Sequence, residues 1–245
     1  MKEKEKFYPE ALFGGFTDID GTVAFFSRVN ALIDPSFVVL DVGCGRGAYN
    51  EDPVIYRKNL RILKGKAAKL IGIDLDLNAK DNPCLDDFRL IEGDAYAWPV
   101  DNNSIDLIVC DNVLEHVPDP DRLFVEIHRV LKNGGYLCLR TPNRWSYIAI
   151  AATLIPNSYH SNVVAFAQDG RKQEDVFPTV YKCNSIHKLK NMMEKHGLES
   201  VVYGHEAEPS YLSFSSIAYF FGVIYQRFSP KFIKSELFAF GKIEK

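Results

Sequence analysis

The segment Val38–Gly47, with the sequence VVLDVGCGRG, decides the fold. It begins with an apolar run of strand-forming residues, too short for a typical helix, which predicts a buried parallel strand. A carboxylate, Asp41, interrupts this run just before three glycines at every second position. Glycine allows a sharp backbone turn and a close ligand approach, because it has no Cβ. A buried strand that ends in such a turn is typical of nucleotide-binding α/β domains.

The length and composition fit one large α/β domain, or a core domain that carries a small cap. The chain has 245 residues and a mass of 27.8 kDa, with 47% apolar and 25% charged residues, an ordinary balance for a globular protein. Its 29 basic and 32 acidic residues give a net charge of −3. This charge argues against nucleic acid as a partner. The basic residues between Arg57 and Lys69 are interpreted as the solvated face of a helix.

Cysteine usage and the N-terminal sequence predict a cytoplasmic protein. The first residues, MKEKEKFYPE, are charged and contain no apolar segment of the signal-peptide kind. No apolar run reaches the roughly 18 residues of a membrane-spanning helix, so we expect no stable membrane insertion. The cysteines show no paired spacing, and those in or beside apolar strands are expected to behave as small hydrophobic residues. The five are Cys44, Cys84, Cys110, Cys138 and Cys183.

Apolar runs that alternate with amphipathic segments predict a doubly wound, mostly parallel sheet. After the opening strand, we expect further strands at residues 69–74, 88–91, 104–110, 136–139, 198–203 and 234–243. Helices are expected at residues 18–33, 53–64, 184–196 and 214–228, with a short apolar segment at 147–155. Residues 1–15 are expected to form a loose arm.

Capping residues mark two of the predicted helices. Asp52 and Pro53 predict the start of the helix at 53–64, several residues later than the glycine turn. Asp119 and Pro120 predict the start of another helix. We expect that helix to end at the segment Asn133-Gly134-Gly135.

Three predicted strands end in or near a carboxylate, at Asp41, Asp74 and Asp94. In an open α/β sheet, ligands bind outside the carboxyl ends of the strands, so these acids are expected to converge on one pocket. Aspartate is also common in turns, and a chance alignment is the alternative. Three acids on successive strands, each near a glycine, favour a shared binding function.

A nicotinamide dinucleotide is a competing ligand, because residues 43–48 satisfy the pattern G-x-G-x-x-G/A. A dinucleotide presents its anionic pyrophosphate to this turn and requires a helix N-terminus close behind it. Here Asp41 precedes the first glycine and the helix begins late. A carboxylate in that place suits a cationic ligand. S-adenosylmethionine carries an ammonium and a sulfonium and has no phosphate.

With these motifs in place, the chain resembles a class I S-adenosylmethionine-dependent methyltransferase, of the broad small-molecule type called type 11. The matching stretches are VVLDVGCGRG, LIGIDLD, IEGDAYAWPVDNNSIDLIVCDNVLEHV and RVLKNGGYLCLRTPN. They cover residues 38–143 in the family's order. The resemblance implies a Rossmann-like, doubly wound, seven-stranded sheet that is mostly parallel, with an antiparallel last strand and a small helical cap.

The resemblance also implies the cofactor site. In the family, the glycine-rich turn lies against the methionine end of the cofactor, an acid at the position of Asp74 accepts the ribose hydroxyls, and an acid at that of Asp94 receives the adenine amino group. The segment from Gly45 to Asp74 is longer than the usual spacing of about 20 residues. The implied cofactor contacts are Asp41, Gly43, Cys44, Gly45, Asp74, Leu75, Asp94, Ala95, Asp111 and Asn112.

Methyl transfer from a sulfonium needs mainly in-line positioning and, for an O or N acceptor, removal of a proton. His116 follows the fourth strand and is our candidate general base. The alternative, that His116 merely caps or packs the loop, has equal weight. The spacing of His and acidic residues gives no metal-binding motif, and we expect no metal.

We interpret residues 1–245 as a single methyltransferase domain. Residues 16–143 would form the cofactor-binding core with its N-terminal helix, 144–183 a cap insertion, and 184–245 the C-terminal helices and last strands. The aromatic triplet Tyr219-Phe220-Phe221 raises the idea of a lipid-like acceptor or a membrane surface, but packing of this segment on the core is favoured.

Two functions remain open from the sequence. The first is methyl transfer to an O, N or C acceptor on a small molecule. The second is a cofactor-binding or scaffold protein of the same fold that does not transfer a methyl group.

Overall fold

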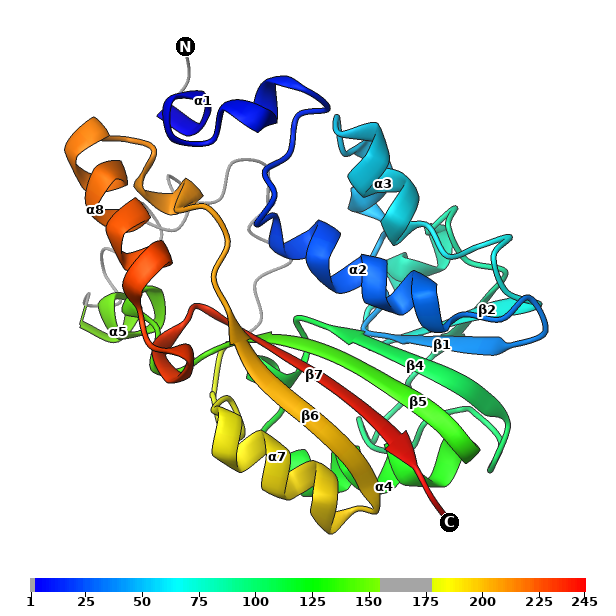
Figure 1. Cartoon of the computed structure of the whole chain (residues 1–245). Helices are drawn as coiled ribbons and strands as arrows, with labels where there is room; N and C mark the ends of the chain where they lie inside the picture. The colour runs from blue at the N-terminus through cyan, green and yellow to red at the C-terminus, as the bar shows by residue number, and fades with distance from the viewer. Residues whose placement is uncertain (1–2, 155–177) are drawn as a thin grey trace.

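The computed structural model describes residues 3–154 and 178–245, and within it a single seven-stranded sheet runs in the order β3-β2-β1-β4-β5-β7-β6 (Figure 1). β7 is antiparallel to both of its neighbours, and the other paired strands are parallel. The predicted fold class is therefore confirmed. The strands are β1 (Val38–Val42), β2 (Lys69–Asp74), β3 (Asp87–Leu90), β4 (Ile105–Asp111), β5 (Leu131–Pro142), β6 (Leu198–His205) and β7 (Glu236–Ile243).

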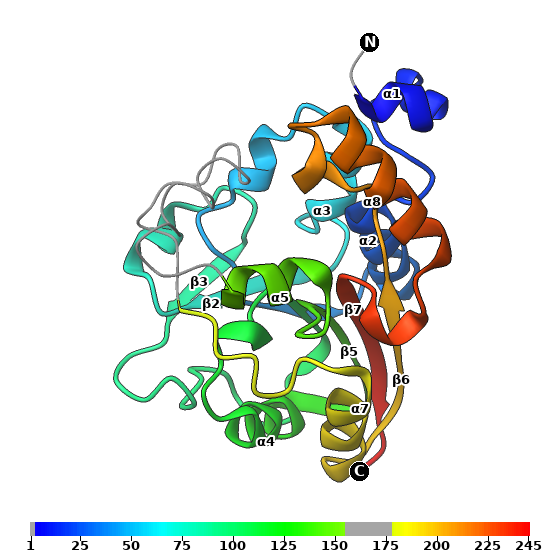
Figure 2. The ribbon, with the colours of Figure 1, turned by 90° about the vertical axis from the view of Figure 1, so that its left-hand side faces the viewer.

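Helices cover both faces of the sheet, as Figure 1 shows. The longer helices are α2 (Gly21–Leu32), α3 (Ile55–Arg61), α4 (Pro120–Val130), α5 (Tyr147–Leu154), α7 (Ile186–Lys195) and α8 (Ser216–Phe228). Short helices are α1 (Glu3–Phe7), η1 (Pro9–Leu12), η2 (Ala48–Glu51), η3 (Leu77–Asp81), η4 (Leu114–His116), η6 (Ser210–Leu212) and η7 (Lys231–Ile233). α5 and α8 lie beyond the carboxyl ends of the parallel strands (Figures 1 and 2). Of the predicted cap at 144–183, residues 155–177 lie outside the described part of the chain.

Alternating side chains of the strands feed two separate cores, because successive residues of a strand point to opposite faces. On β1, Val39 packs in one core with Phe25 of α2. Its neighbour Leu40 packs in the other core with Phe124 of α4 and Leu189 of α7. The central strands are thus buried on both sides, which explains why they read as continuous apolar runs.

All five cysteines are free and buried. Cys44 and Cys138 belong to one core and Cys110 and Cys183 to the other. Burial raises the pKa of each thiol, that of Cys183 to about 11. The expectation that Cys44, Cys110 and Cys138 act as small hydrophobic side chains is confirmed.

Side-chain caps start the helices where the sequence supplies a suitable acceptor. The Asp119 carboxylate accepts a hydrogen bond from the backbone N–H of Arg122, and Pro120 occupies the first turn of α4, as predicted. Asp20, which the sequence analysis did not single out, caps α2 by accepting from Val23 N at 2.9 Å.

The predicted helix at 53–64 is shorter in the structure, and its predicted cap is wrong. α3 begins after Val54, and the Asp52 side chain instead holds Arg57 through two hydrogen bonds of 2.6 and 2.8 Å. The chain becomes extended at Ile62, before the predicted stop at Gly65. The Asp52 carboxylate also accepts from Val54 N–H at 2.9 Å, which closes a local turn before the helix and does not cap it.

The predicted end of α4 at Asn133-Gly134-Gly135 is also wrong. The helix stops at Val130, because Leu131 is already extended and pairs with Ile105 of β4. Residues 133–135 form an irregular start of β5, where the register between the two strands shifts. Strand pairing therefore takes precedence over the local glycine signal.

The N-terminal segment is not the loose arm that its composition predicted. From residue 3 on it forms α1 and η1, and Tyr8 is buried against α8. The Phe7 ring lies 5.6 Å from that of Tyr219, and Lys4 Nζ donates to the Gly15 carbonyl at 2.9 Å. Contacts with a helix some 200 residues later in the chain hold this segment in place.

The aromatic triplet of α8 only partly follows the expectation of core packing. Tyr219 is 1% exposed, as expected. Phe220 and Phe221 are 48% and 62% exposed, so the expectation is wrong for these two rings. Phe221 lies on the outward side of the helix, and Phe220 lies at its edge, with its ring centre 6.2 Å from that of Phe7.

Candidate functional site

The glycine turn after β1 is fixed to β2 by its backbone. The N–H groups of Gly43 and Cys44 both donate to the carbonyl of Ile73, at 2.9 and 3.3 Å. Gly43, Gly45 and Gly47 have φ angles of 67°, 54° and 77°, in the left-handed region that favours glycine. This conformation explains the requirement for glycine at every second position.

The three glycines differ in what surrounds them. A Cβ on Gly43 would lie 2.5 Å from Cγ2 of Val113, and one on Gly47 would collide with the Asn82 amide. These two glycines allow close packing within the protein. A Cβ on Gly45 would meet nothing within 4 Å. The backbone at Gly45 therefore faces open space, where a ligand can approach.

Asp74 lies beside this open backbone. Its Oδ2 accepts a hydrogen bond from Gly45 N–H at 2.9 Å, and its Oδ1 accepts from Asp76 N–H at 2.9 Å. The Asn82 amide also donates to the Gly45 carbonyl at 3.0 Å. The long intervening segment, which departs from the family's usual spacing, does not separate the turn from Asp74, because its residues form η2 and α3 outside the pairing of β1 with β2.

Asp41 carries a half-buried carboxyl group at this same end of the sheet. Burial raises its pKa to about 7, and the nearby Asp111 and Asp74 add to this rise, while Arg61 opposes it. Among the described residues, none donates a hydrogen bond to this carboxyl group. It is a half-buried acid with a raised pKa, which a cationic group could stabilise in its charged form.

Asp111, at the end of β4, is held by a buried arginine. Arg140 of β5 is 5% exposed and donates from Nε to Oδ1 at 2.6 Å and from Nη2 to Oδ2 at 2.8 Å. The Asn112 amide donates to the same Oδ1 at 2.9 Å, and Asn112 has a φ of 57°. The guanidinium lies 5.4 Å from the ring centre of Phe25. The Asp111 carboxylate is thus already paired within the protein.

A second arginine, Arg61 of α3, faces the same acids. Its Nη2 lies 3.9 Å from Asp111 Oδ2, and its guanidinium lies 4.7 Å from the ring centre of Tyr49. Burial lowers the pKa of Arg61, and its buried Nε has no hydrogen-bond partner in the described part of the chain. A buried donor without a partner is costly, so this group is a candidate for binding an anionic ligand group.

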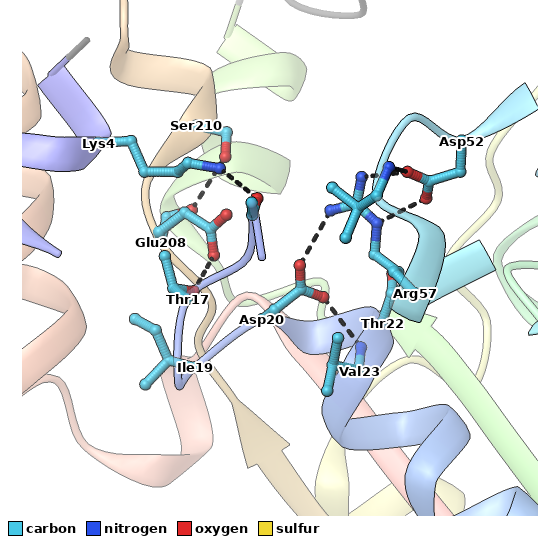
Figure 3. Close-up of polar contacts among 12 residues, drawn as sticks. Lys4, Thr17, Ile19, Asp20, Thr22, Val23, Asp52, Arg57, Glu208 and Ser210 are labelled. Atoms are coloured by element: carbon cyan, nitrogen blue, oxygen red, sulfur yellow. Dashed lines mark hydrogen bonds and ion pairs between the residues drawn. The ribbon is translucent and has the colours of Figure 1, made fainter. Parts of the chain in front are cut away.

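An ion-pair chain joins the helices that border the site, as Figure 3 shows. Arg57 of α3 donates to Asp20 at 2.9 Å as well as to Asp52. Because Asp20 also caps α2, the start of α2 and the start of α3 are held together. Thr17 donates to Glu208 at 2.9 Å, which ties the chain before α2 to the segment before α8.

The predicted adenine-binding residues lie in a more exposed region. Asp94 forms an ion pair with Arg122, whose hydrogen bond lowers the pKa of the Asp94 carboxyl, and Asp94 Oδ1 accepts from Tyr96 N at 3.1 Å. Ala95 is half-buried. Leu75 is exposed after β2. The acid of this region is already paired within the protein.

Cys44 differs from its neighbours in the turn. Its side chain is buried in the core that includes Leu70 and Leu85, and its Sγ lies where a Cβ on Gly72 would collide with it. Only the backbone of Cys44 is therefore presented on the side of Gly45.

His116 ends η4, the short helix after β4. Its Nδ1 lies 3.1 Å from the Pro178 carbonyl oxygen and its Nε2 lies 3.8 Å from Glu115 Oε1. Because a carbonyl oxygen only accepts, Nδ1 carries the hydrogen in the neutral ring. Nε2 is then the proton acceptor, and Glu115 can stabilise the charge after protonation.

Buried polar residues position the loop of His116. Glu115 Oε2 accepts from Thr141 Oγ1 at 2.9 Å, and Asn184 Nδ2 donates to the same hydroxyl at 2.6 Å. The Glu115 carbonyl accepts from Val180 N at 2.7 Å and from Tyr181 N at 3.2 Å. η4, β5 and the segment before α7 thus meet at Glu115.

The sequence analysis missed several of these residues. Arg140 interrupts the apolar segment LCLRTP, and a charge in a buried strand is a usable signal. Arg61 and Arg57 were assigned to a solvated helix face, which is wrong for both because they pair with acids of the site region. Within residues 3–154 and 178–245, no cluster of three or more potential metal ligands occurs.

Comparisons with known proteins agree with this arrangement. A family model described as a methyltransferase domain matches residues 16–203, well over half of the chain. A ubiquinone biosynthesis O-methyltransferase of Pseudomonas paraeruginosa is 28% identical over 179 residues, covering 62% of this chain and 72% of that protein. An uncharacterized methyltransferase of Schizosaccharomyces pombe is 31% identical over 139 residues, covering 53% of this chain and 47% of that protein. The chain thus spans about half the length of several curated relatives that it matches.

Solved structures share the fold at low sequence identity. An S-adenosylmethionine-dependent methyltransferase of Archaeoglobus fulgidus superposes with a TM-score of 0.54 and 20% identity, covering 95% of this chain and 97% of that one. A geranyl diphosphate C-methyltransferase of Streptomyces coelicolor, solved with S-adenosyl-L-homocysteine, gives a TM-score of 0.54 and 16% identity, with coverage of 90% and 77%. The glycine turn, the acids at the strand ends and the family match lead to one conclusion: the chain belongs to the methyltransferase domain family, among the class I S-adenosylmethionine-dependent methyltransferases.

Proposed function

We propose that the chain catalyses methyl transfer from S-adenosylmethionine to an O, N or C atom of a small molecule. The observation that carries the proposal is the pairing of open backbone at Gly45 with the raised pKa of the Asp41 carboxyl group. A cationic ligand at this position would stabilise the charged form of this half-buried acid. Family membership supports the same donor.

The residues of the site fit the groups of S-adenosylmethionine. Asp41 would hold the ammonium of the methionine part, and Arg61 its carboxylate, which would give the buried Nε a partner. Asp74, oriented by Gly45 and Asp76, would accept the ribose hydroxyls. Asp94 and the Ala95 backbone would bind adenine. The bound cofactor supplies an activated methyl group on a sulfonium.

The protein's own contribution is positioning and, for an O or N acceptor, proton removal. We assign the base to Nε2 of His116, with the proton moving from the acceptor to this nitrogen and Glu115 stabilising the resulting imidazolium. Asp111 and Asn112 would border the pocket next to the methyl group. Arg140 and the Asn112 amide both donate to Asp111, which fixes the position of this carboxylate.

Nearby tyrosines are poor alternatives as the base. Tyr147 of α5 and Tyr225 of α8 meet with ring centres 4.9 Å apart. Burial raises the pKa of both, that of Tyr225 to about 12. Both hydroxyls therefore stay protonated near neutral pH, and that of Tyr225 already donates to the Ile233 carbonyl, so neither suits deprotonation of an acceptor.

The acceptor side of the site is assigned to the segments after β5. We propose the arrangement expected from the sequence: one domain over residues 1–245, with a core at 16–143, a cap at 144–183 and C-terminal elements at 184–245. The relatives named as O-methyltransferases make oxygen acceptors the first class to test.

Calorimetric titration of the full chain with S-adenosylmethionine and with S-adenosyl-L-homocysteine tests the cofactor proposal. We expect both compounds to bind. If neither of them binds, the cofactor proposal is refuted. Transfer of a labelled methyl group to a panel of phenols, amines and activated carbon acids tests the activity. Binding without transfer to any acceptor class would instead favour a cofactor-binding scaffold.

A further inference from the structure

We infer that the outward face of α8 docks on an anionic lipid bilayer. This helix buries one face in the protein through Tyr219, Gly222 and Val223. The Tyr8 side chain lies in the same small core. The inward face is therefore already used, and any further function of α8 belongs to its other side.

The other side of α8 carries an exposed apolar stripe, which we call the α8 stripe. Its members are spaced three, four and seven residues apart, so they lie along one side of the helix. Ile217 is 72% exposed and Phe228 is 78% exposed. A contiguous apolar surface of this kind is uncommon on a protein without a binding partner. The stripe consists of Ile217, Phe220, Phe221, Ile224 and Phe228.

The exposed apolar surface continues into the neighbouring segments. Phe214 precedes α8 and Phe232 follows it in η7, and both are exposed. α5 packs beside α8 through Tyr147 and Tyr225, and it is preceded by the exposed Trp145. Bulky rings are thus available on two adjoining helices and their flanks.

The charge of the segment from residue 209 to residue 235 favours an anionic partner, although Glu3 of α1 lies beside the start of α8. No acidic residue occurs from residue 209 to residue 235, although the whole chain has a net charge of −3. Three basic residues lie in the same span, and the exposed Arg227 and Lys231 directly precede the exposed Phe228 and Phe232. Aromatic rings beside basic groups suit a bilayer surface, where rings enter the headgroup region and cations meet anionic lipids.

The geometry fits docking on the surface and not insertion across it. In the described part of the chain, no helix is long and apolar enough to cross a membrane. α8 has 13 residues and would lie in the plane of the interface. Because α8 and α5 lie beyond the carboxyl ends of the strands (Figure 2), docking brings lipid to the same end of the sheet as the glycine turn.

Sedimentation of the full chain with lipid vesicles tests this inference without any methyl transfer. The vesicles contain phosphatidylcholine alone, or phosphatidylcholine mixed with phosphatidylglycerol, at low and at high salt. We expect the protein to sediment with the mixed vesicles, and high salt to weaken this binding. Cofactor binding, measured separately by calorimetry, distinguishes a failure of this inference from a failure of the proposed function.

Two double variants remove the apolar and the charged parts of the surface. Phe221→Ser with Phe228→Ser is expected to lower vesicle partitioning by about tenfold or more. Arg227→Gln with Lys231→Gln is expected to lower it about fivefold for each charge removed. The matched controls are Val125→Ser with Val201→Ser, exposed apolar residues on other elements, and Lys188→Gln with Lys190→Gln on α7. Both controls should bind vesicles like the wild type.

Three outcomes would overturn the inference. The wild type could stay in the supernatant of the mixed vesicles. The double variant Phe221→Ser with Phe228→Ser could sediment with the vesicles to the same extent as the wild type. The wild type could form a dimer that the phenylalanine variant converts to a monomer, with no vesicle binding, which would assign the α8 stripe to a second copy of the chain.

Discussion

Arg140 and Asp111 face each other across neighbouring strands with two parallel hydrogen bonds, and both groups are almost withdrawn from water. Breaking a buried ion pair by removing one partner leaves the other charge unpaired, which costs about 3–5 kcal/mol. The pair therefore holds the ends of β4 and β5 together beside the site, as long as both members are present.

Arg140→Met is expected to lower the free energy of unfolding by about 3–5 kcal/mol in urea titration. Lys132→Met is the control, because its partner Asp106 forms a more exposed pair and such pairs contribute at most about 1 kcal/mol. Equal losses in the two variants would contradict the role assigned to the Arg140 pair.

The affinity for S-adenosylmethionine is expected to rise with pH around neutrality. The pKa of Asp41 is raised to about 7, so its carboxylate forms as the pH increases from about 6 to about 7.5, and affinity for a cationic ligand should grow severalfold. Calorimetry across this range checks the profile. In Asp41→Asn the affinity should be roughly tenfold to a hundredfold lower, and this rise should be absent. Asp81→Asn, at an exposed acid, should keep the wild-type profile.

Asp41→Asn is also expected to stabilise the cofactor-free protein. A raised pKa means that the folded state binds a proton more tightly than the unfolded state, so this group lowers stability as the pH rises from about 4 to about 7. Asp41→Asn should therefore raise the free energy of unfolding near pH 8 by about 1–3 kcal/mol, allowing for partial exposure. The gain should shrink near pH 5. Destabilisation by this variant at pH 8 would show that Asp41 has a favourable partner in the folded protein.

Two glycines of the same turn should respond differently to alanine. Gly45→Ala carries only the cost of left-handed backbone, about 1–2 kcal/mol, and should weaken cofactor binding by at least about tenfold by occupying the open side. Gly43→Ala adds a collision with Val113 and should cost about 3 kcal/mol or more. Thermal unfolding and calorimetry separate the two effects. Normal cofactor affinity in Gly45→Ala would place the ligand elsewhere.

His116→Gln is expected to leave cofactor affinity unchanged while lowering kcat for an oxygen acceptor by about 10²–10⁴-fold. His187→Gln, at an exposed histidine of α7, is the matched control and should keep full activity. An unchanged kcat in His116→Gln would assign this residue to loop packing, the alternative that the sequence left open.

Local signals in the sequence were sufficient for the fold and for much of the site. The apolar run of β1, the left-handed glycines and the Asp119 cap are each determined within a few residues, and the structure confirms them. The roles of Asp74 and Asp94 toward a cofactor came from the resemblance and stay predictions.

The features that could not be predicted depend on residues far apart in the chain. Arg140 finds Asp111 only once β4 and β5 pair. The N-terminal segment is ordered by Tyr219, and α4 ends early because Leu131 joins the sheet. Composition could not indicate that Phe221 points outward while Tyr219 points inward, because both are large and apolar.

The burial of all five thiols gives the protein an internal reporter of its own unfolding. Thiolate is the reactive form, and both burial and a raised pKa suppress it in the folded state. Alkylating reagents should therefore modify a cysteine only when the structure around it opens. The mass added at each cysteine then shows which part of the chain has opened. Cys84, outside the strands, and Cys110, in the centre of the sheet, would then time local and global opening in one experiment.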